Sequence, residues 1–175
     1  MLRSAVLALL LALTTPAVAQ ETPADPPMTI QRLAELILVI DDEAVARGAT
    51  FQFTVQDVPI MVVADPLADR MRAMVPIRSA EGLEPEELMR LMQANFDSAL
   101  DARYAVAQGR LWGVYIHPLR PLEKDQFFSA IAQTVNVALT YGLTYSGGAQ
   151  TFGGGDSNDI YRELFEELQK RGQEI

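Results

Sequence analysis

The residue types from which enzymes build reactive sites are scarce in this sequence. His117 is the only histidine among the 175 residues, and the chain contains no cysteine. A metal site would therefore have to be assembled from scattered carboxylates, and a catalytic triad would have to pair a serine with His117. None of the serines lies in a Gly-x-Ser-x-Gly motif, which presents the nucleophile in many hydrolases. We predict no catalytic residue, no metal ion and no cofactor.

A partial calcium-loop pattern occurs late in the sequence. Asp156, Asn158 and Glu167 match the first, third and last positions of a calcium-binding loop. Ile160, however, stands where an oxygen ligand is required, and Tyr161 replaces the glycine that the loop needs for its sharp turn. A helix cap followed by a solvated helix face explains the same residues, and we adopt this interpretation.

The charge of the chain argues against nucleic acid as a partner. With 14 basic and 23 acidic side chains, the formal net charge is −9. Contacts to a phosphate backbone require clustered lysines and arginines, so an acidic chain binds nucleic acid poorly. We predict a protein or peptide partner instead.

Residues 1–19 have the pattern of a cleaved signal peptide. Arg3 precedes an apolar run over residues 5–13, and the stretch Ala17-Val18-Ala19 is typical of a signal-peptidase site. The apolar run is too short to cross a bilayer core of about 30 Å as a helix. We predict cleavage after Ala19, a periplasmic mature chain without membrane insertion, and a flexible lead-in over residues 20–27.

The first helix is expected to begin after Thr29, which can cap it. Apolar residues recur at helical spacing from Ile30 to Ala44, and Arg47-Gly48 has the features of a helix end. Additional apolar residues widen this surface beyond one stripe, which indicates either burial within the domain or contact with a partner. The partner-binding candidates on this helix are Leu36, Leu38 and Val39.

Three extended runs follow, and a second helix comes after them. The runs cover residues 50–55, 60–64 and 70–77, and the third alternates between apolar and polar residues. Pro85 suits the first position of the helix. Its predicted inner face consists of Leu88, Leu91, Met92, Phe96, Ala99 and Leu100.

Residues 102–118 have the pattern of a β-hairpin that turns at Gln108-Gly109. Alternation places Trp112, Val114 and Ile116 on one face of the second strand, and we predict that helices cover this face. A third helix is expected from about Pro121 to Gly142.

The last part of the chain changes in composition. Residues 145–157 form a Gly-rich linker, and residues 158–175 have the pattern of an amphipathic helix. An isolated helix of this length is marginal in water, so its apolar stripe needs a surface on its own domain, a dimer mate or a partner. Its partner-binding candidates are Ile160, Leu164, Phe165 and Leu168.

The predicted order, α-β-β-β-α-β-β-α plus a C-terminal helix, resembles the type III secretion chaperone-like fold and, within it, the YbjN-domain group of bacterial proteins. The resemblance covers residues 28–144 and rests on the segments FQFTVQDVP, RMRAMVPI, LMRLMQANF, RYAVAQGRLWGVYI and FFSAIAQTVNVALTYG. It implies an α+β domain with helices packed on an antiparallel sheet. It also implies a homodimer, or a chain that holds an extended partner on apolar patches.

Together these features predict a non-catalytic, exported binding protein of the bacterial cell envelope with a chaperone-like or regulatory role. Its partner would be a polypeptide or its own dimer mate. Two alternatives stay open at this point: a small periplasmic hydrolase with a carboxylate or serine site, and a small-ligand sensor.

Overall fold

The computed structural model describes residues 25–97, 100–142 and 159–173. These residues form an α+β domain with helices packed on an antiparallel sheet, as the sequence predicts. In chain order the elements are α1 (Ile30–Ile40), β1 (Val45–Arg47), β2 (Thr50–Val55), β3 (Val58–Asp65), β4 (Arg70–Ser79), α2 (Pro85–Asp97), β5 (Arg103–Ala107), β6 (Arg110–His117), α3 (Lys124–Leu139) and α4 (Asp159–Gly172). None of the helices among them is long and apolar enough to cross a membrane.

The sheet has six strands in the order β1-β2-β3-β4-β6-β5, and all neighbouring strands are antiparallel. Two tight turns have positive φ at both central residues, namely Gln56-Asp57 and Gln108-Gly109. Such turns match the right-handed twist of the strands they join. The predicted hairpin turn at Gln108-Gly109 is therefore confirmed.

The first helix ends earlier than predicted. Thr29 caps its start through the bond from the Arg32 N–H, as expected, but the helix stops at Ile40. The carboxylate of Asp41 then accepts hydrogen bonds from the backbone N–H groups of Glu43 and Thr54, at 3.0 and 2.8 Å. These bonds turn the chain away from the helix axis, so residues 45–47 form the additional strand β1 instead of a last helical turn.

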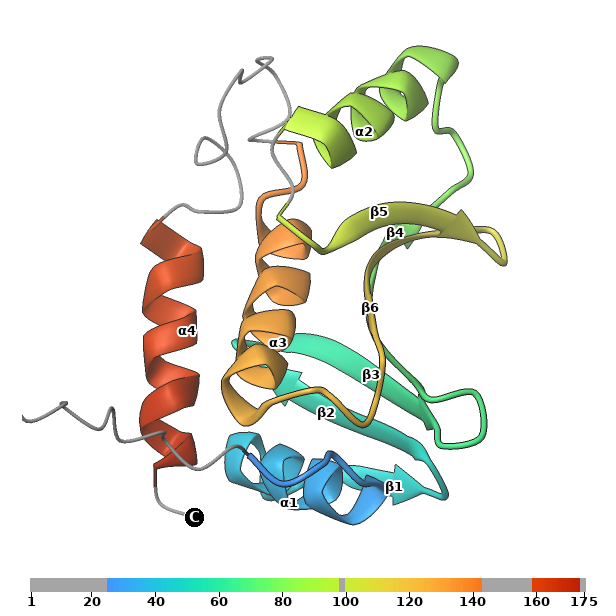
Figure 1. The fold of residues 1–175 in the computed structure, drawn as a ribbon. Coiled ribbons are helices and arrows are strands. Elements are labelled where there is room, and N and C mark those ends of the chain that lie inside the picture. The colour runs from blue at the N-terminus through green and yellow to red at the C-terminus, as the bar shows by residue number, and fades with distance from the viewer. Residues whose placement is uncertain (1–24, 98–99, 143–158, 174–175) are drawn as a thin grey trace, which may run out of the picture.

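Helices α1, α3 and α4 form two layers on one face of the sheet, and α2 lies beside β5 at its edge (Figure 1). α3 lies against β3, β4, β5 and β6, α1 packs on β2, and α4 packs on α3 and α1. Because α3 has the sheet on one side and α4 on the other, it is buried on nearly all sides. The inner face of the sheet supplies the rest of the core: Phe51, Phe53, Val55, Ile60, Val62, Ala64, Met71, Ala73, Val75, Tyr104, Leu111 and Tyr115.

The prediction that Trp112, Val114 and Ile116 lie under the helices is wrong. The side chains of Leu111 and Tyr115 are the buried ones in β6, and Ile116 is 55% exposed. The reason is Gly113, which points toward α3. A Cβ at this position would lie 3.3 Å from both the Thr134 carbonyl oxygen and Val137 Cγ1, so the helix can approach only over a glycine.

The predicted inner face of α2 is also wrong in part. Leu91 is buried, together with Ala94, which the prediction did not include. Leu88, Met92 and Phe96 are exposed, because α2 contacts the body of the domain mainly through β5. Ala99 lies outside the described residues.

The C-terminal helix packs on its own domain, which is one of the three surfaces considered above. Leu164 and Leu168 are fully buried between α4, α3 and α1. Lys124 Nζ donates to the Gly172 carbonyl oxygen at 3.1 Å, and Arg171 Nη1 donates to that of Ile40 at 2.7 Å. The predicted signal peptide, most of the lead-in and the Gly-rich linker over residues 145–157 lie outside the described residues.

Candidate functional site

The face of the sheet opposite the helices carries a continuous apolar surface, which we call the open face. Its residues point outward from β3, β4, β5 and β6, and they are aligned across the strands by the register of the sheet. No element of the described part of the chain packs over them (Figure 1). The open face consists of Pro59, Met61, Val63, Arg72, Met74, Pro76, Ala105, Trp112, Val114 and Ile116.

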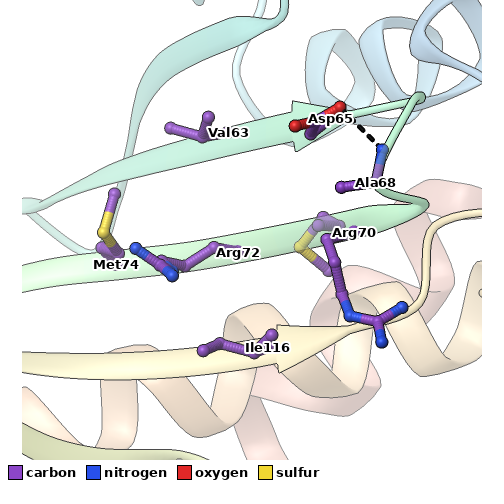
Figure 2. A pocket seen from close by; sticks show the side chains of 8 residues that line it. Val63, Asp65, Ala68, Arg70, Arg72, Met74 and Ile116 are labelled. Carbon is purple, nitrogen blue, oxygen red and sulfur yellow. Dashed lines mark hydrogen bonds between the residues drawn. The ribbon is translucent and has the colours of Figure 1, made fainter.

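Three shallow grooves join one another along this surface. The central groove, of about 490 Å³, is lined by Met61, Arg72, Met74, Trp112 and other residues of β5 and β6. A second groove, of about 440 Å³, shares Arg72, Met74 and Ile116 with it (Figure 2). The third, of about 450 Å³ beside β2, shares Met61 and Trp112 with the central groove. The three grooves therefore form one extended depression rather than separate sites.

Trp112 is anchored on this surface by a hydrogen bond to the backbone. Its Nε1 donates to the Ala107 carbonyl oxygen at 3.0 Å, which satisfies the single donor of the ring. The indole therefore presents apolar atoms to the central groove without an unpaired polar group.

Both edges of the sheet are partly closed to a further strand. At the β5 edge, the Asn95 side chain of α2 accepts from the Tyr104 N–H at 2.7 Å and donates to the Tyr104 carbonyl at 3.0 Å. At the β2 edge beyond β1, the Thr54 N–H donates to Asp41. Side chains that occupy the backbone groups of an edge strand prevent another chain from pairing there. At these two places the open face is therefore more accessible than the edge of the sheet.

Helix α2 carries a second exposed apolar group. The exposed fraction is 61% for Met89, 53% for Met92 and 85% for Phe96. These residues are spaced three and four apart, so they lie on one side of the helix. Exposed large apolar side chains that gather on one helix face typically mark an interaction surface.

The partner-binding candidates named from the sequence fall into three groups. Leu36, Leu164 and Leu168 are buried where α1, α3 and α4 meet, so in this fold they contact their own chain. Leu38 and Ile160 are exposed. The remaining two, Val39 and Phe165, are half-buried. Their role in partner binding stays a prediction.

The polar side chains of His117 and Tyr115 on the sheet make structural contacts. His117 Nδ1 donates to the Pro118 carbonyl oxygen at 2.7 Å, and its ring stacks on Tyr115. Burial, and to a smaller extent the charge of Asp101 and the neighbouring Tyr161, raises the pKa of Tyr115 above its ordinary value of 10.0. Among the described residues no three His, Asp or Glu side chains are grouped so that they could hold a metal ion.

Sequence reasoning missed the open face because it assigned the bulky side of β6 to the core. One signal in the sequence could have found it. Arg70, Arg72 and Met74 alternate on β4 with the apolar residues of the inner face, which identifies their side as the uncovered one. Any apolar residue that the register aligns with Arg72 must then be uncovered too, and Ile116 is that residue.

Comparison with known proteins agrees with this architecture. No protein-family model matches the sequence, and no curated protein matches it. Among solved structures, the chain resembles the Yersinia pestis type III secretion chaperone SycH in its complex with a stable fragment of YscM2. That match has 15% sequence identity and a TM-score of 0.51, and it covers 64% of this chain and 98% of the other.

A second solved structure, that of the HopA1–SchA chaperone–effector complex, matches with 11% identity and a TM-score of 0.48, over 66% of this chain and 98% of the other. At such identities the likeness to SycH shows the fold. The described domain therefore has the type III secretion chaperone-like α+β fold, as the order of its elements predicted.

Proposed function

We propose that this chain is a non-catalytic, chaperone-like binding protein that holds a polypeptide partner on the open face. The observation that carries the proposal is the contrast within one sheet: the inner face is packed under helices, while an apolar outer face has no cover among the described residues. Folded proteins seldom leave a contiguous apolar surface that spans several strands uncovered unless something binds to it.

The shape of the surface favours a chain over a small molecule. Small-ligand sites are concave and enclose most of the ligand, whereas the three grooves here are open and run into one another. An extended segment would contact all three at once. The likeness to SycH, a chaperone solved with a protein fragment, is consistent with such a role.

The location is part of the same proposal. We place the mature chain in the periplasm because residues 1–19 have the pattern of a signal peptide. The resemblance of residues 28–144 to the YbjN-domain group supports a bacterial protein, and the signal-peptide pattern supports the cell envelope. Mass spectrometry of the exported chain tests this location, since a mature N-terminus at Gln20 is expected and an intact Met1 would contradict it.

We also propose that the exposed apolar side of α2 binds a second copy of the chain. Met89, Met92 and Phe96 are exposed on one helix side, and an isologous contact would cover them on both copies. We expect the chain to sediment as a dimer and Phe96→Asp to sediment as a monomer. Leu67→Asp, at a fully exposed position between β3 and β4, is the matched control and should leave the dimer intact.

The binding role is tested with a permanently unfolded probe, reduced and carboxymethylated α-lactalbumin. The wild-type chain should bind it, and Val114→Asp should weaken binding by about tenfold or more because a charge then lies in the central groove. Lys170→Glu, at an exposed position of α4, is the control and should bind as the wild type does. Equal binding by all three chains would contradict the proposal.

A further inference from the structure

The charge of the outer side of the sheet is opposite to that of the whole chain. The charged residues that point outward from the six strands are five arginines and one aspartate, a net of +4 from 5 − 1, whereas the chain carries −9. Asp41 and Glu43 add carboxylates only at the margin beside β2. The outward charged residues are Arg47, Asp65, Arg70, Arg72, Arg103 and Arg110.

Arg72 is the arginine that lies within the apolar surface itself. The register places it between Val63 on β3 and Ile116 on β6, and its side chain extends along β4 toward Met74 (Figure 2). It lines both the central groove and the neighbouring one. Among the residues that the structure describes, its guanidinium has no hydrogen-bond or ion-pair partner.

Asp65 and Arg70, which line the same groove as Arg72, already form hydrogen bonds with the backbone. Asp65 Oδ1 accepts from the N–H groups of Leu67 and Ala68, at 2.9 and 3.0 Å, and Figure 2 shows the bond from Ala68. Arg70 Nη1 donates to the Asp69 carbonyl oxygen at 2.8 Å. Arg72 therefore stands as a cation inside an apolar surface with its donors available.

This arrangement constrains what can cover the surface. A purely apolar segment laid over Arg72 would remove a guanidinium from water without pairing it, and an unpaired buried charge is strongly unfavourable. A second copy of the same face would bring arginines toward arginines, which costs further energy. A carboxylate satisfies the guanidinium with two parallel hydrogen bonds, and pairing is strengthened where water is excluded.

We infer that the open face takes an extended polypeptide segment in which apolar residues flank a carboxylate, and that Arg72 binds this carboxylate. The inference rests on the proposed function and specifies the chemistry of the partner. From β2 to β5 the sheet is about 19 Å wide, from a strand spacing of about 4.8 Å. About six extended residues cover that distance, so the recognised element is a short motif.

The sequence provides a built-in reporter for a binding test. Trp112 is the only tryptophan of the chain and lies in the central groove, so its fluorescence reports occupation of the open face. Three unlabelled nine-residue peptides serve as probes. They alternate Val and Thr and differ only in the central residue, which is Glu, Gln or Lys. Each is titrated into the wild type, Arg72→Glu and Lys170→Glu.

The variants differ in where the same charge reversal is made. Arg72→Glu changes the open face, whereas Lys170→Glu changes an exposed position of α4 on the helix side of the molecule. We expect the wild type and Lys170→Glu to bind the Glu peptide about tenfold more tightly than the Gln peptide, and the Lys peptide most weakly. Arg72→Glu should reverse the order and prefer the Lys peptide. Circular dichroism checks that each variant is folded.

The other outcomes are distinguishable. If the three peptides change Trp112 fluorescence equally and Arg72→Glu has no effect, the inferred carboxylate recognition is wrong while the proposed polypeptide binding stands. If Trp112 fluorescence changes with protein concentration alone, a second copy covers the open face and the inference is overturned. If no peptide changes the signal at any concentration, polypeptide binding on this face fails as well.

Discussion

The two faces of the sheet are made by the same strands and are both rich in apolar residues, yet only one forms the core. On the inner face Val62, Ala73 and Leu111 have no exposed surface. On the outer face Ile116 is more than half exposed. The difference lies in residue size and charge: the inner face has small residues where α3 crosses, and the outer face has arginines among its large residues. Apolar alternation alone therefore does not identify the buried side.

The comparison also separates folding from binding. The inner face contributes stability through burial, at about 25 cal/mol per Å² removed from water. The outer face exposes apolar surface to water in the described chain, so it contributes less to folding and retains free energy for binding. If this division is correct, substitutions on the inner face should mainly lower stability. Substitutions on the outer face should mainly weaken polypeptide binding.

The largest effect is expected from a matched pair of truncations on β6. Leu111→Ala removes a fully buried side chain and should lower the free energy of unfolding by about 2–5 kcal/mol, because a cavity remains. Ile116→Ala removes an exposed side chain and should cost less than about 1 kcal/mol. Urea unfolding of both variants measures the difference. Similar losses for the two would contradict the assignment of the faces.

A second pair adds atoms instead of removing them. Gly113→Ala brings a Cβ within 3.3 Å of the Thr134 carbonyl oxygen, so the backbone of the buried helix α3 must shift by a few tenths of an ångström, and we expect a loss of about 1–2 kcal/mol. Ala105→Val adds atoms on the outer face, in the open central groove, and should change stability by less than about 0.5 kcal/mol. Thermal unfolding compares them. A destabilised Ala105→Val with an unchanged Gly113→Ala would reverse the assignment.

Much of the fold is readable from the sequence because local signals and tertiary contacts agree. Thr29 caps α1 and Gln108-Gly109 turns the hairpin, both as predicted, and β4 alternates between buried apolar and outward polar residues as its sequence indicates. In these places a short-range preference of the residue itself, for a cap, a positive φ or solvent, determines the local structure.

The predictions that failed depend on contacts between distant residues. The end of α1 is set by Asp41, whose carboxylate binds the backbone of Thr54 thirteen positions away. The faces of β6 are set by the close approach of α3 to Gly113. Neither contact leaves a periodic pattern in the sequence. The open face was missed because the larger side chains of β6 were assigned to the core, and only strand pairing shows that Trp112 lies in one groove with Met74.

Trp112 distinguishes the corrected face assignment from the original one. A buried aromatic costs about 3–5 kcal/mol on truncation, but Trp112 is partly exposed, so Trp112→Ala should cost only about 1 kcal/mol. The same variant should bind the unfolded probe more weakly, because the central groove loses its largest apolar side chain. Denaturant unfolding and probe binding are measured on one preparation. Trp112→Phe, which lacks the bond to Ala107, shows how much of the loss that bond accounts for.

The smallest effect concerns the inner face at high pH. Because burial raises the pKa of Tyr115 above 10.0, the folded chain favours the neutral phenol more than the unfolded chain does. This contribution to stability is fully present below the unfolded pKa near 10 and is lost as the pH rises through the higher folded pKa. The wild type should therefore lose more stability between about pH 8 and about pH 11 than Tyr115→Phe, which has no phenol to ionise. Parallel pH profiles for the two chains would show that the Tyr115 hydroxyl is in contact with solvent. The inner face of β6 would then be less completely buried than the contrast between the two faces requires.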